Sequence, residues 1–503
     1  MKNIKNFIKN NYKDIIYVLI ILLANIVFIN KKITDNKLAL IMVCLVNVAM
    51  ILVYYFIIRK NENIKLEKLY LLIIIPIGLL FLLVFPILHV PDEGNHFMRI
   101  NEIAEGKLFS KIDKKKNMQG TYLDSNLSNF RAMEENYNYE TNFKLIKYTN
   151  SSTKKFYSFA NTALYSFACY LPQTIGLLFG KILHLPILIQ AYLARLFNFI
   201  VFSILSYFAL KLLPLKKNVF AIILLSPLVI QEAISMAPDA LTIGLSAFLI
   251  SYVLYLKSKK EEKLQKKNII VLTLSSIVLS LCKIIYLPIC FIILLIPKEK
   301  FKSVKKKYLI LLSIILSAVI INLLWLSYSS KMLPTGDNIN SSLQLHNIIN
   351  NPFNYFKVFC RTISSESIGY VLNSFGAALG WYDIILSKIY LLPILLIFAG
   401  YTLFDNKKTN VKITTIEKIF AIAIFVGITI LMGTSLYLQW TPVGESTIYG
   451  IQGRYFLPLY FLLGMIFTKY TISPKINFDN RKIYLYIFAL DLYAASMIFI
   501  EKL

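Results

Sequence analysis

The chain has 503 residues, of which 57% are hydrophobic and 16% charged, and its mean hydropathy is +0.62. A water-soluble fold of this length cannot bury so much apolar surface. The composition therefore predicts an integral membrane protein and excludes secreted domains, soluble enzymes and receptors with a single span. Much of the net charge of +27 lies in short loops beside apolar runs, which is typical of cytoplasmic loops and not of nucleic-acid binding.

The first 88 residues contain three apolar runs that are long enough to span a membrane. These are Ile15–Ile29, Leu38–Ile58 and Leu69–Leu88. Lysines before the first run and basic residues between the second and third predict that both segments, and the N-terminus, are cytoplasmic. The third span then brings the chain to the outer face at His89. We expect residues 89–186 to form a large extracytoplasmic loop in which Phe156–Gly180, rich in aromatic residues and broken by Pro172, forms interfacial helices.

Loop charge also predicts the topology of the remaining chain. The lysine-rich loops Lys257–Lys267 and Lys298–Lys307 should both be cytoplasmic, so Ile269–Ile296 forms a hairpin with its tip near Cys282. Residues 327–387 form a second external segment. The other expected spans are Leu188–Leu212, Val219–Ser235, Ala240–Leu256, Tyr308–Leu326, Ile389–Leu403, Ile416–Leu436, Phe456–Phe467 and Ile483–Ile500. The sequence thus predicts an all-α polytopic membrane protein with about 13 transmembrane helices.

The densest group of charges is the segment HVPDEGNHFMR, which begins at His89 just after the third span. In a helix, Asp92 and His96 share a face, and so do His96 and Arg99. Charge at a membrane boundary is costly unless it serves a function. The structural alternative is that Asp92 or Glu93 merely stabilises the N-terminus of an interfacial helix. That alternative explains the two carboxylates but not the histidine and the arginine.

Further polar residues are expected at the same outer face, namely Asp239 in SMAPDALT, Lys283 and Tyr286 in CKIIYLP, and Arg454 in GIQGRYFLP. A lysine inside an apolar run is costly and usually has an anionic partner, and an arginine beside glycines suits a phosphate clamp. Arg195, about two turns inside its span, could likewise face a phosphate. Structural alternatives remain: Asp239 could cap a helix, Lys283 could extend to the headgroups, and Arg454 could be an interfacial anchor.

Six motifs, taken together, resemble in the same order the landmarks of a bacterial family of polytopic membrane proteins of unknown function that is grouped with the GT-C glycosyltransferases. The resemblance runs from about Leu69 to Tyr470. The motifs are PDExxHF at Pro91–Phe97, YLPQxxG at Tyr170–Gly176, YLARLFN at Tyr192–Asn198, APDALT at Ala237–Thr242, KxxYLP at Lys283–Pro288 and GIQGRYFLP at Gly450–Pro458.

This resemblance implies a GT-C-like catalytic module over residues 69–470, an added transmembrane hairpin over residues 1–68, and a last helix within residues 471–503. It also implies inverting transfer of a sugar from a polyprenyl-phosphate donor, with Asp92 as general base and Glu93 as its partner. Lys283 and Arg454 would hold the lipid phosphate. The other residues that we expect at the substrate are His96, Arg99, Arg195, Asp239, Tyr286, Gln452 and Tyr455.

The expected partners are the lipid-linked sugar, an envelope glycan or lipid acceptor, and the bilayer of the bacterial plasma membrane, with the active site facing outside. A divalent cation could assist, with Asp92, Glu93 and His96 as candidate ligands, but no ligand spacing demands one and no other cofactor is indicated. Three alternatives stay open. A transporter or flippase of lipid-linked sugars would suit the charged residues and broken helices. A glycan polymerase or ligase would use similar cations, and a catalytically inactive scaffold would keep the fold alone.

Overall fold

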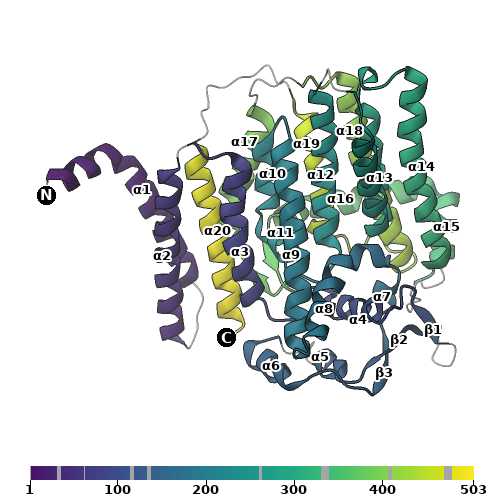
Figure 1. The fold of residues 1–503 in the computed structure, drawn as a ribbon, viewed down its shortest axis with the longest axis horizontal. Helices are drawn as coiled ribbons and strands as arrows, with labels where there is room; N and C mark the ends of the chain where they lie inside the picture. Colours follow the sequence, from purple (N-terminus) through teal and green to yellow (C-terminus); the bar gives the residue numbers. More distant parts are fainter. Residues whose placement is uncertain are drawn as a thin grey trace.

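The computed structural model describes residues 2–30, 36–61, 63–113, 118–132, 137–259, 263–329, 339–405, 411–468 and 479–503. The described residues are mostly α-helical, and the long helices lie side by side (Figure 1). Eight helices within these residues are long and apolar enough to cross a membrane, which supports the predicted class of fold. They are α1 (Lys2–Asn30), α2 (Lys37–Lys60), α3 (Leu66–Val84), α9 (Ile187–Leu212), α12 (Asp239–Ser258), α14 (Val304–Ser329), α18 (Thr415–Gln439) and α20 (Asn480–Glu501).

Shorter apolar helices pack among these eight. They are α10 (Lys217–Leu224), α11 (Pro227–Ala233), α13 (Lys266–Cys282), the 3-10 helix η3 (Ile284–Leu295), α17 (Lys388–Phe404) and α19 (Leu457–Ile466). The expected span Val219–Ser235 is not one continuous helix but is divided into α10 and α11. Pro227 has no N–H to donate to a helical hydrogen bond, and a proline disfavours helical backbone geometry at the residue that precedes it. The predicted turn near Cys282 is confirmed, since α13 ends there, Lys283 is extended, and η3 packs against α13.

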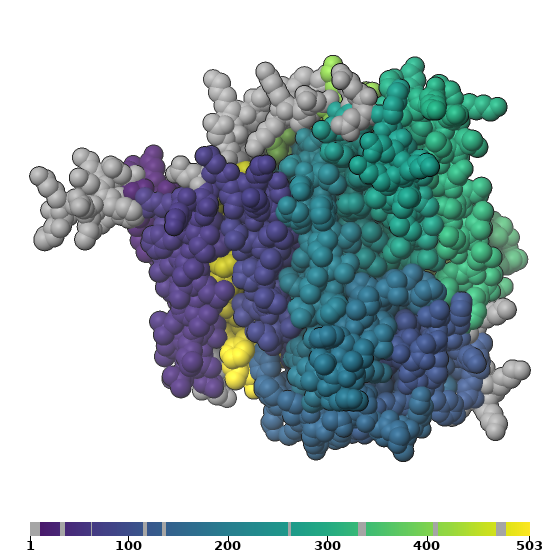
Figure 2. All heavy atoms as spheres, in the orientation of Figure 1, coloured from purple at the N-terminus to yellow at the C-terminus, as the bar shows by residue number. Residues whose placement is uncertain are grey.

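The segment after α3 gathers at one end of the bundle, the lower end in Figure 1, and its surface covers that end in Figure 2. Its helices are α4 (Glu93–Ala104), α5 (Leu127–Arg131), α6 (Tyr139–Lys144), η1 (Leu145–Lys147), α7 (Ala160–Ala163), η2 (Phe167–Tyr170) and α8 (Leu171–Ile182). In line with the interfacial prediction, Phe156–Gly180 contains only short helices and the end of a strand, and α8 lies with them at the lower end of the bundle in Figure 1.

This segment also contains a small antiparallel sheet that the sequence analysis did not predict. The sheet has the order β1 (Lys111–Asp113), β2 (Met118–Asp124) and β3 (Lys154–Ser158), with Gly120 opposite Ser158. The fold is therefore mainly, rather than entirely, α-helical. The sheet escaped prediction because β1 has only three residues, with two of them exposed, which gives no clear alternation of apolar and polar side chains.

Residues 339–387, part of the expected second external segment, form α15 (Ser341–Asn350), α16 (Pro352–Ser374) and a hairpin of β4 (Ala378–Leu379) and β5 (Ile384–Ile385). The hairpin packs against α11 and α20. The 3-10 helix η6 (Gly453–Phe456) packs on α16. A Cβ atom at Gly453 would lie 2.6 Å from the backbone nitrogen of Ser374, so only glycine permits this approach. Arg454 is thereby held close to the hairpin.

The N-terminal pair α1 and α2 packs along α20 (Figure 1). Asn25 Nδ2 donates to the Ala489 carbonyl at 3.0 Å, and Asn47 Nδ2 donates to Ser496 Oγ at 2.7 Å. Hydrogen bonds of this kind hold helices together in lipid, where the hydrophobic effect between helices is weak. At the C-terminus, Lys502 Nζ lies 2.6 Å from Asp383 Oδ2 beside the β4–β5 hairpin. Helix α20 therefore joins the N-terminal pair to the rest of the bundle.

Candidate functional site

Asp92 is presented outward by an unusual backbone conformation. It precedes α4 with φ 64° and ψ 1°, in the left-handed region that a non-glycine residue rarely occupies, and its side chain makes no capping hydrogen bond. The Asp92 side chain therefore does not cap α4, contrary to the structural alternative. The side chain is 40% exposed, and Asn161 Nδ2 donates to its Oδ1 at 3.3 Å. A carboxylate freed from capping can accept a proton or a ligand hydrogen bond.

The neighbouring Glu93 is fully buried in an ion pair with Arg195. Arg195 Nε lies 2.8 Å from Glu93 Oε1, and its Nη2 lies 2.5 Å from Oε2. The same guanidinium donates to the carbonyls of Phe85 and Pro86, at 2.7 and 2.8 Å. The two carboxylate oxygens of Glu93 also accept from the backbone nitrogens of Leu88 and Met236. Glu93 and Arg195 thus satisfy each other and fix the position of the preceding residue, Asp92.

Two other motif residues hold the linker between α11 and α12. Gln173 Nε2 donates to the Ala237 carbonyl at 3.2 Å, and Asn198 Nδ2 donates to the Ser235 carbonyl at 2.8 Å. The linker ends at Asp239, the first residue of α12. The motifs YLPQxxG and YLARLFN therefore act at one place, where they position Asp239.

Lys283 forms a buried ion pair with Asp239. Its Nζ lies 2.5 Å from Asp239 Oδ1 and 4.9 Å from the centroid of the Tyr455 ring. Tyr286 donates its hydroxyl to the Tyr455 carbonyl at 2.9 Å. The predicted residues Asp239, Lys283, Tyr286 and Tyr455 are thus brought together. Because the charge of Lys283 is matched by an anion, this lysine does not simply extend to solvent.

Arg454 lies between two carboxylates and is buried. Its Nη2 lies 3.5 Å from Asp92 Oδ2, and its Nη1 lies 3.7 Å from Glu232 Oε2. Among the described residues, Nε and Nη1 of Arg454 and Oε2 of Glu232 have no hydrogen-bond partner. Gln452 directly precedes η6 and, with Glu232, lines a small cavity beside Arg454. Sequence reasoning missed Glu232, although a glutamate in the otherwise uncharged run Val219–Ser235 was a usable signal.

His96 and Arg99 face different surroundings on α4. His96 Nδ1 lies 2.7 Å from the Tyr170 hydroxyl, and its ring is buried against Tyr165 and Tyr170. Arg99 pairs with Glu102 and donates to the Leu108 carbonyl at 2.8 Å. Arg99 therefore serves to hold the segment after α4. Burial lowers the pKa of His96 to about 4, opposed by the charges of Asp92 and Asp239.

This lowered pKa predicts that the site loses stability in mild acid. His96 stays neutral in the folded protein down to about pH 4, whereas in the unfolded chain it is protonated below about pH 6.5. Its contribution to the free energy of unfolding is therefore fully present above pH 6.5 and is lost as the pH falls towards 4. Between pH 7.5 and 5 we expect a loss of about 2 kcal/mol. Thermal unfolding of the wild type and of His96→Gln at both pH values measures it. An equal pH dependence in the two proteins would contradict this prediction.

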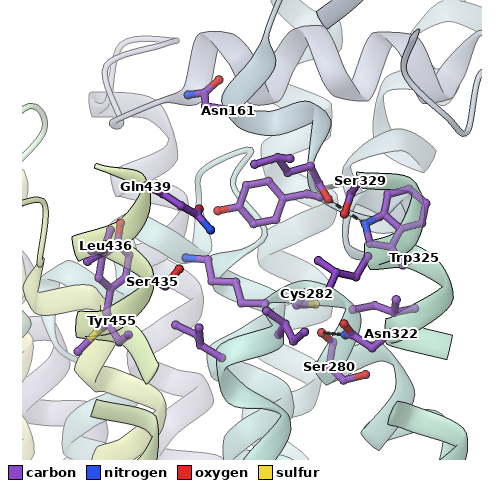
Figure 3. A pocket seen from close by; sticks show the side chains of 18 residues that line it. Asn161, Ser280, Cys282, Asn322, Trp325, Ser329, Ser435, Leu436, Gln439 and Tyr455 are labelled. Carbon is purple, nitrogen blue, oxygen red and sulfur yellow. Dashed lines mark hydrogen bonds between the residues drawn. The ribbon is translucent and has the colours of Figure 1, made fainter. Parts of the chain in front are cut away.

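A pocket of about 310 Å³ lies beside Lys283 and Tyr455 (Figure 3). Asn161, Tyr165, Lys283 and Tyr455 line its polar side, and α13, α14 and α18 supply its other walls. Figure 3 shows Gln439 and Tyr455 on one side of the pocket and Trp325 on the other. Trp325 Nε1 donates to the Leu164 carbonyl at 2.8 Å, which ties α14 to the segment after α7. The pocket thus combines the Lys283–Asp239 ion pair with apolar side chains, a composition that suits an amphiphilic ligand.

The candidate metal ligands do not gather. Among the residues that the structure describes, no group of three or more His, Cys, Asp or Glu side chains is arranged to hold a metal ion. Glu93 is occupied by Arg195, and His96 is paired with Tyr170. A cation bound by Asp92, Glu93 and His96 is therefore not supported by this geometry.

The fold and the site define a polytopic α-helical membrane protein with a partly exposed carboxylate and two buried cations beside a pocket. Residues 75–463 match the family model described as "Predicted membrane protein (DUF2142)". The match covers well over half of the chain, so the protein belongs to this family of unknown function, as the sequence motifs predicted. No curated protein and no solved structure matches the chain significantly.

Proposed function

We propose that the protein is a membrane glycosyltransferase that moves a sugar from a polyprenyl-phosphate donor to an envelope glycan or glycolipid. The observation that carries this proposal is that the partly exposed Asp92 carboxylate pairs with Arg454 and accepts a hydrogen bond from Asn161, which lines the 310 Å³ pocket together with Lys283. Such a transfer needs a base for the acceptor hydroxyl and positive charge for the departing lipid phosphate. Both requirements are met by neighbouring residues.

In the proposed reaction, Asp92 takes the proton of the acceptor hydroxyl while that oxygen attacks the anomeric carbon from the face opposite the phosphate. The bond between the anomeric carbon and the phosphate oxygen breaks, its electron pair stays on the lipid phosphate, and the configuration inverts. Lys283 and Arg454 supply the positive charge that faces the departing phosphate. Glu93 acts indirectly, by holding Asp92 in place through Arg195.

The proposal includes thirteen membrane crossings, an N-terminus in the cytoplasm and a site at the outer face of the plasma membrane. The eight long helices, with α13, η3, α17, α19 and the pair α10–α11 as the further crossings, support that number. The end of α12 and the start of α13, which carry basic residues, lie at the opposite end of the bundle from the segment after α3 (Figure 1), which supports the proposed sidedness.

The first test is a composition and mass analysis of envelope glycans from cells that lack the protein. These cells are complemented, at equal expression, by the wild type, by Asp92→Asn, or by Glu140→Gln, a carboxylate whose side chain is 76% exposed. We expect one sugar substituent to disappear and to return with the wild type and Glu140→Gln. Asp92→Asn should restore less than about 1% of it, because removing a general base costs about 10²–10⁴-fold in rate.

Two results would contradict the proposal. Full restoration by Asp92→Asn would remove Asp92 from the role of base. Unchanged glycans in cells that lack the protein would argue against glycosyl transfer itself. The same cells then allow a direct measurement of lipid-linked sugar flux, which is the property that a transporter would change.

A further inference from the structure

A second cavity, on the Glu232 side of Arg454, carries polar atoms that the fold leaves unpaired. Glu232 Oε2 is buried without a hydrogen-bond partner among the described residues, and so are Nε and Nη1 of Arg454. The separation of 3.7 Å between Oε2 and Nη1 exceeds a hydrogen bond. Buried polar atoms in native proteins nearly always have a partner, because an unpaired one loses its hydration without replacement. These three atoms therefore indicate a place that something else completes.

The space beside them is small and well defined. A cavity of about 20 Å³ is lined by Glu232, Arg454, Gln452, Ala378 and Tyr382, and also by Pro91, which directly precedes Asp92. A volume of this size holds one water molecule or one hydroxyl-bearing arm of a larger molecule. The cavity therefore lies next to the proposed base and on the side of Arg454 that faces Glu232.

The wall of this cavity formed by the β4–β5 hairpin is fixed in place. Asp383 in the hairpin turn accepts from His89 Nε2 at 2.9 Å and lies 2.6 Å from Lys502 Nζ. The backbone nitrogen of Gly380 donates to Gln231 Oε1 at 2.8 Å, and Gln231 Nε2 donates to Glu232 Oε1 at 3.3 Å. Both the oxygen and the nitrogen of the Gln231 side-chain amide thus have hydrogen-bond partners, so this side chain does not turn to donate to Glu232 Oε2.

The unpaired atoms limit the chemistry of a ligand. Glu232 offers an acceptor and Arg454 offers donors, so a hydroxyl fits both because it donates and accepts at once. A phosphate or carboxylate would be repelled by Glu232, and an ammonium group by Arg454. An apolar group would leave all three atoms unpaired. Neutral sugars carry the hydroxyls that this arrangement requires.

We propose that Glu232 and Arg454 form a subsite for a hydroxyl group of a neutral sugar, next to Asp92 and separate from the pocket at Lys283. The inference rests on the proposed function for its biological substrate, since both the donor sugar and the acceptor glycan carry hydroxyls. Glu232 binds and orients the sugar, whereas Asp92 takes the proton. The subsite thereby adds a residue, Glu232, that sequence analysis did not identify.

The test is saturation-transfer difference NMR with the purified full-length protein in lipid nanodiscs. The probes are neutral methyl hexopyranosides and the analogues that lack a single hydroxyl. We expect the wild type and the surface control Glu140→Gln to bind the same glycosides. Glu232→Gln should weaken binding about tenfold. One deoxy analogue should bind poorly to the wild type because it lacks the hydroxyl that contacts Glu232. That analogue should bind to Glu232→Gln no more weakly than it binds to the wild type.

Ala378→Val serves as a second variant that leaves every charge in place. Its two added methyl groups fill the cavity, so binding should fall although Glu232 and Arg454 are unchanged. Thermal unfolding establishes that each variant is folded before binding is measured. A short-chain prenyl-phosphate sugar then distinguishes the two sources of the hydroxyl: competition with the glycoside assigns the subsite to the donor sugar, and simultaneous binding assigns it to the acceptor.

The proposal is overturned if none of the glycosides binds to the wild type, or if Glu232→Gln and Ala378→Val both bind as the wild type does. In either case the cavity holds water only. These outcomes are distinct from failure of the proposed function, because glycoside binding does not require turnover. Binding without any change in envelope glycans would refute the transferase and leave the subsite intact.

Discussion

Replacing Arg195 with methionine is expected to destabilise the protein by about 3–5 kcal/mol, because it leaves the carboxylate of Glu93 buried without its cation. The carbonyls of Phe85 and Pro86 also lose their hydrogen bonds. Since Arg195 joins α9 to the chain just before and at the start of α4, the site should loosen around Asp92 first. Thermal unfolding in detergent, with folded yield from size-exclusion chromatography, measures the effect.

The matched control is Arg361→Met, which removes an exposed arginine and should leave the unfolding temperature unchanged. The double replacement Glu93→Gln with Arg195→Met tests the cause. It removes both buried charges, so it should recover part of the lost stability. If Arg195→Met unfolds at the wild-type temperature, the ion pair does not hold the site together. If the double replacement is no more stable than the single one, the loss comes from the carbonyl contacts.

The general position of the site followed from the sequence because loop charge fixes which end of each helix faces which side. That reasoning places Asp92, Asp239, Lys283 and Arg454 at one face without any knowledge of their contacts. The structure brings these four residues into two ion pairs, Lys283 with Asp239 and Arg454 with Asp92. The turn at Lys283 was predictable for the same reason, since two basic loops enclose an apolar run that is too long for one helix.

Which side chains pair with one another at that face could not be predicted, because the pairing depends on how each helix is rotated about its own axis. Glu93 and Arg195 are 102 residues apart, and only the tertiary fold, which brings the first residue of α4 to the side chain of Arg195 on α9, makes them partners. Hydropathy averages also conceal isolated charges, and so Glu232 was read as part of an apolar span. The left-handed backbone at Asp92 has no sequence signature, since aspartate before a helix usually caps it.

Removing the cation at Lys283 should abolish sugar transfer for two separable reasons. Lys283→Met leaves the Asp239 carboxylate buried without a partner, which we expect to cost about 3–5 kcal/mol of stability. The double replacement Asp239→Asn with Lys283→Met removes both charges and should restore much of that stability. Under the proposed function, transfer should nevertheless stay about 10²–10³-fold below the wild type, because the phosphate loses a cation that stabilises its developing charge.

The control for this experiment is the double replacement Glu140→Gln with Lys144→Met. It removes an exposed ion pair with the same change in charge and should alter neither stability nor transfer. Unfolding temperature and recovery of the missing envelope sugar are measured for all variants at equal expression. Full recovery by the Asp239→Asn, Lys283→Met protein would show that Lys283 serves only to neutralise Asp239. The phosphate would then have to be held by Arg454 alone, and the single variant Lys283→Met would fail through misfolding and not through lost chemistry.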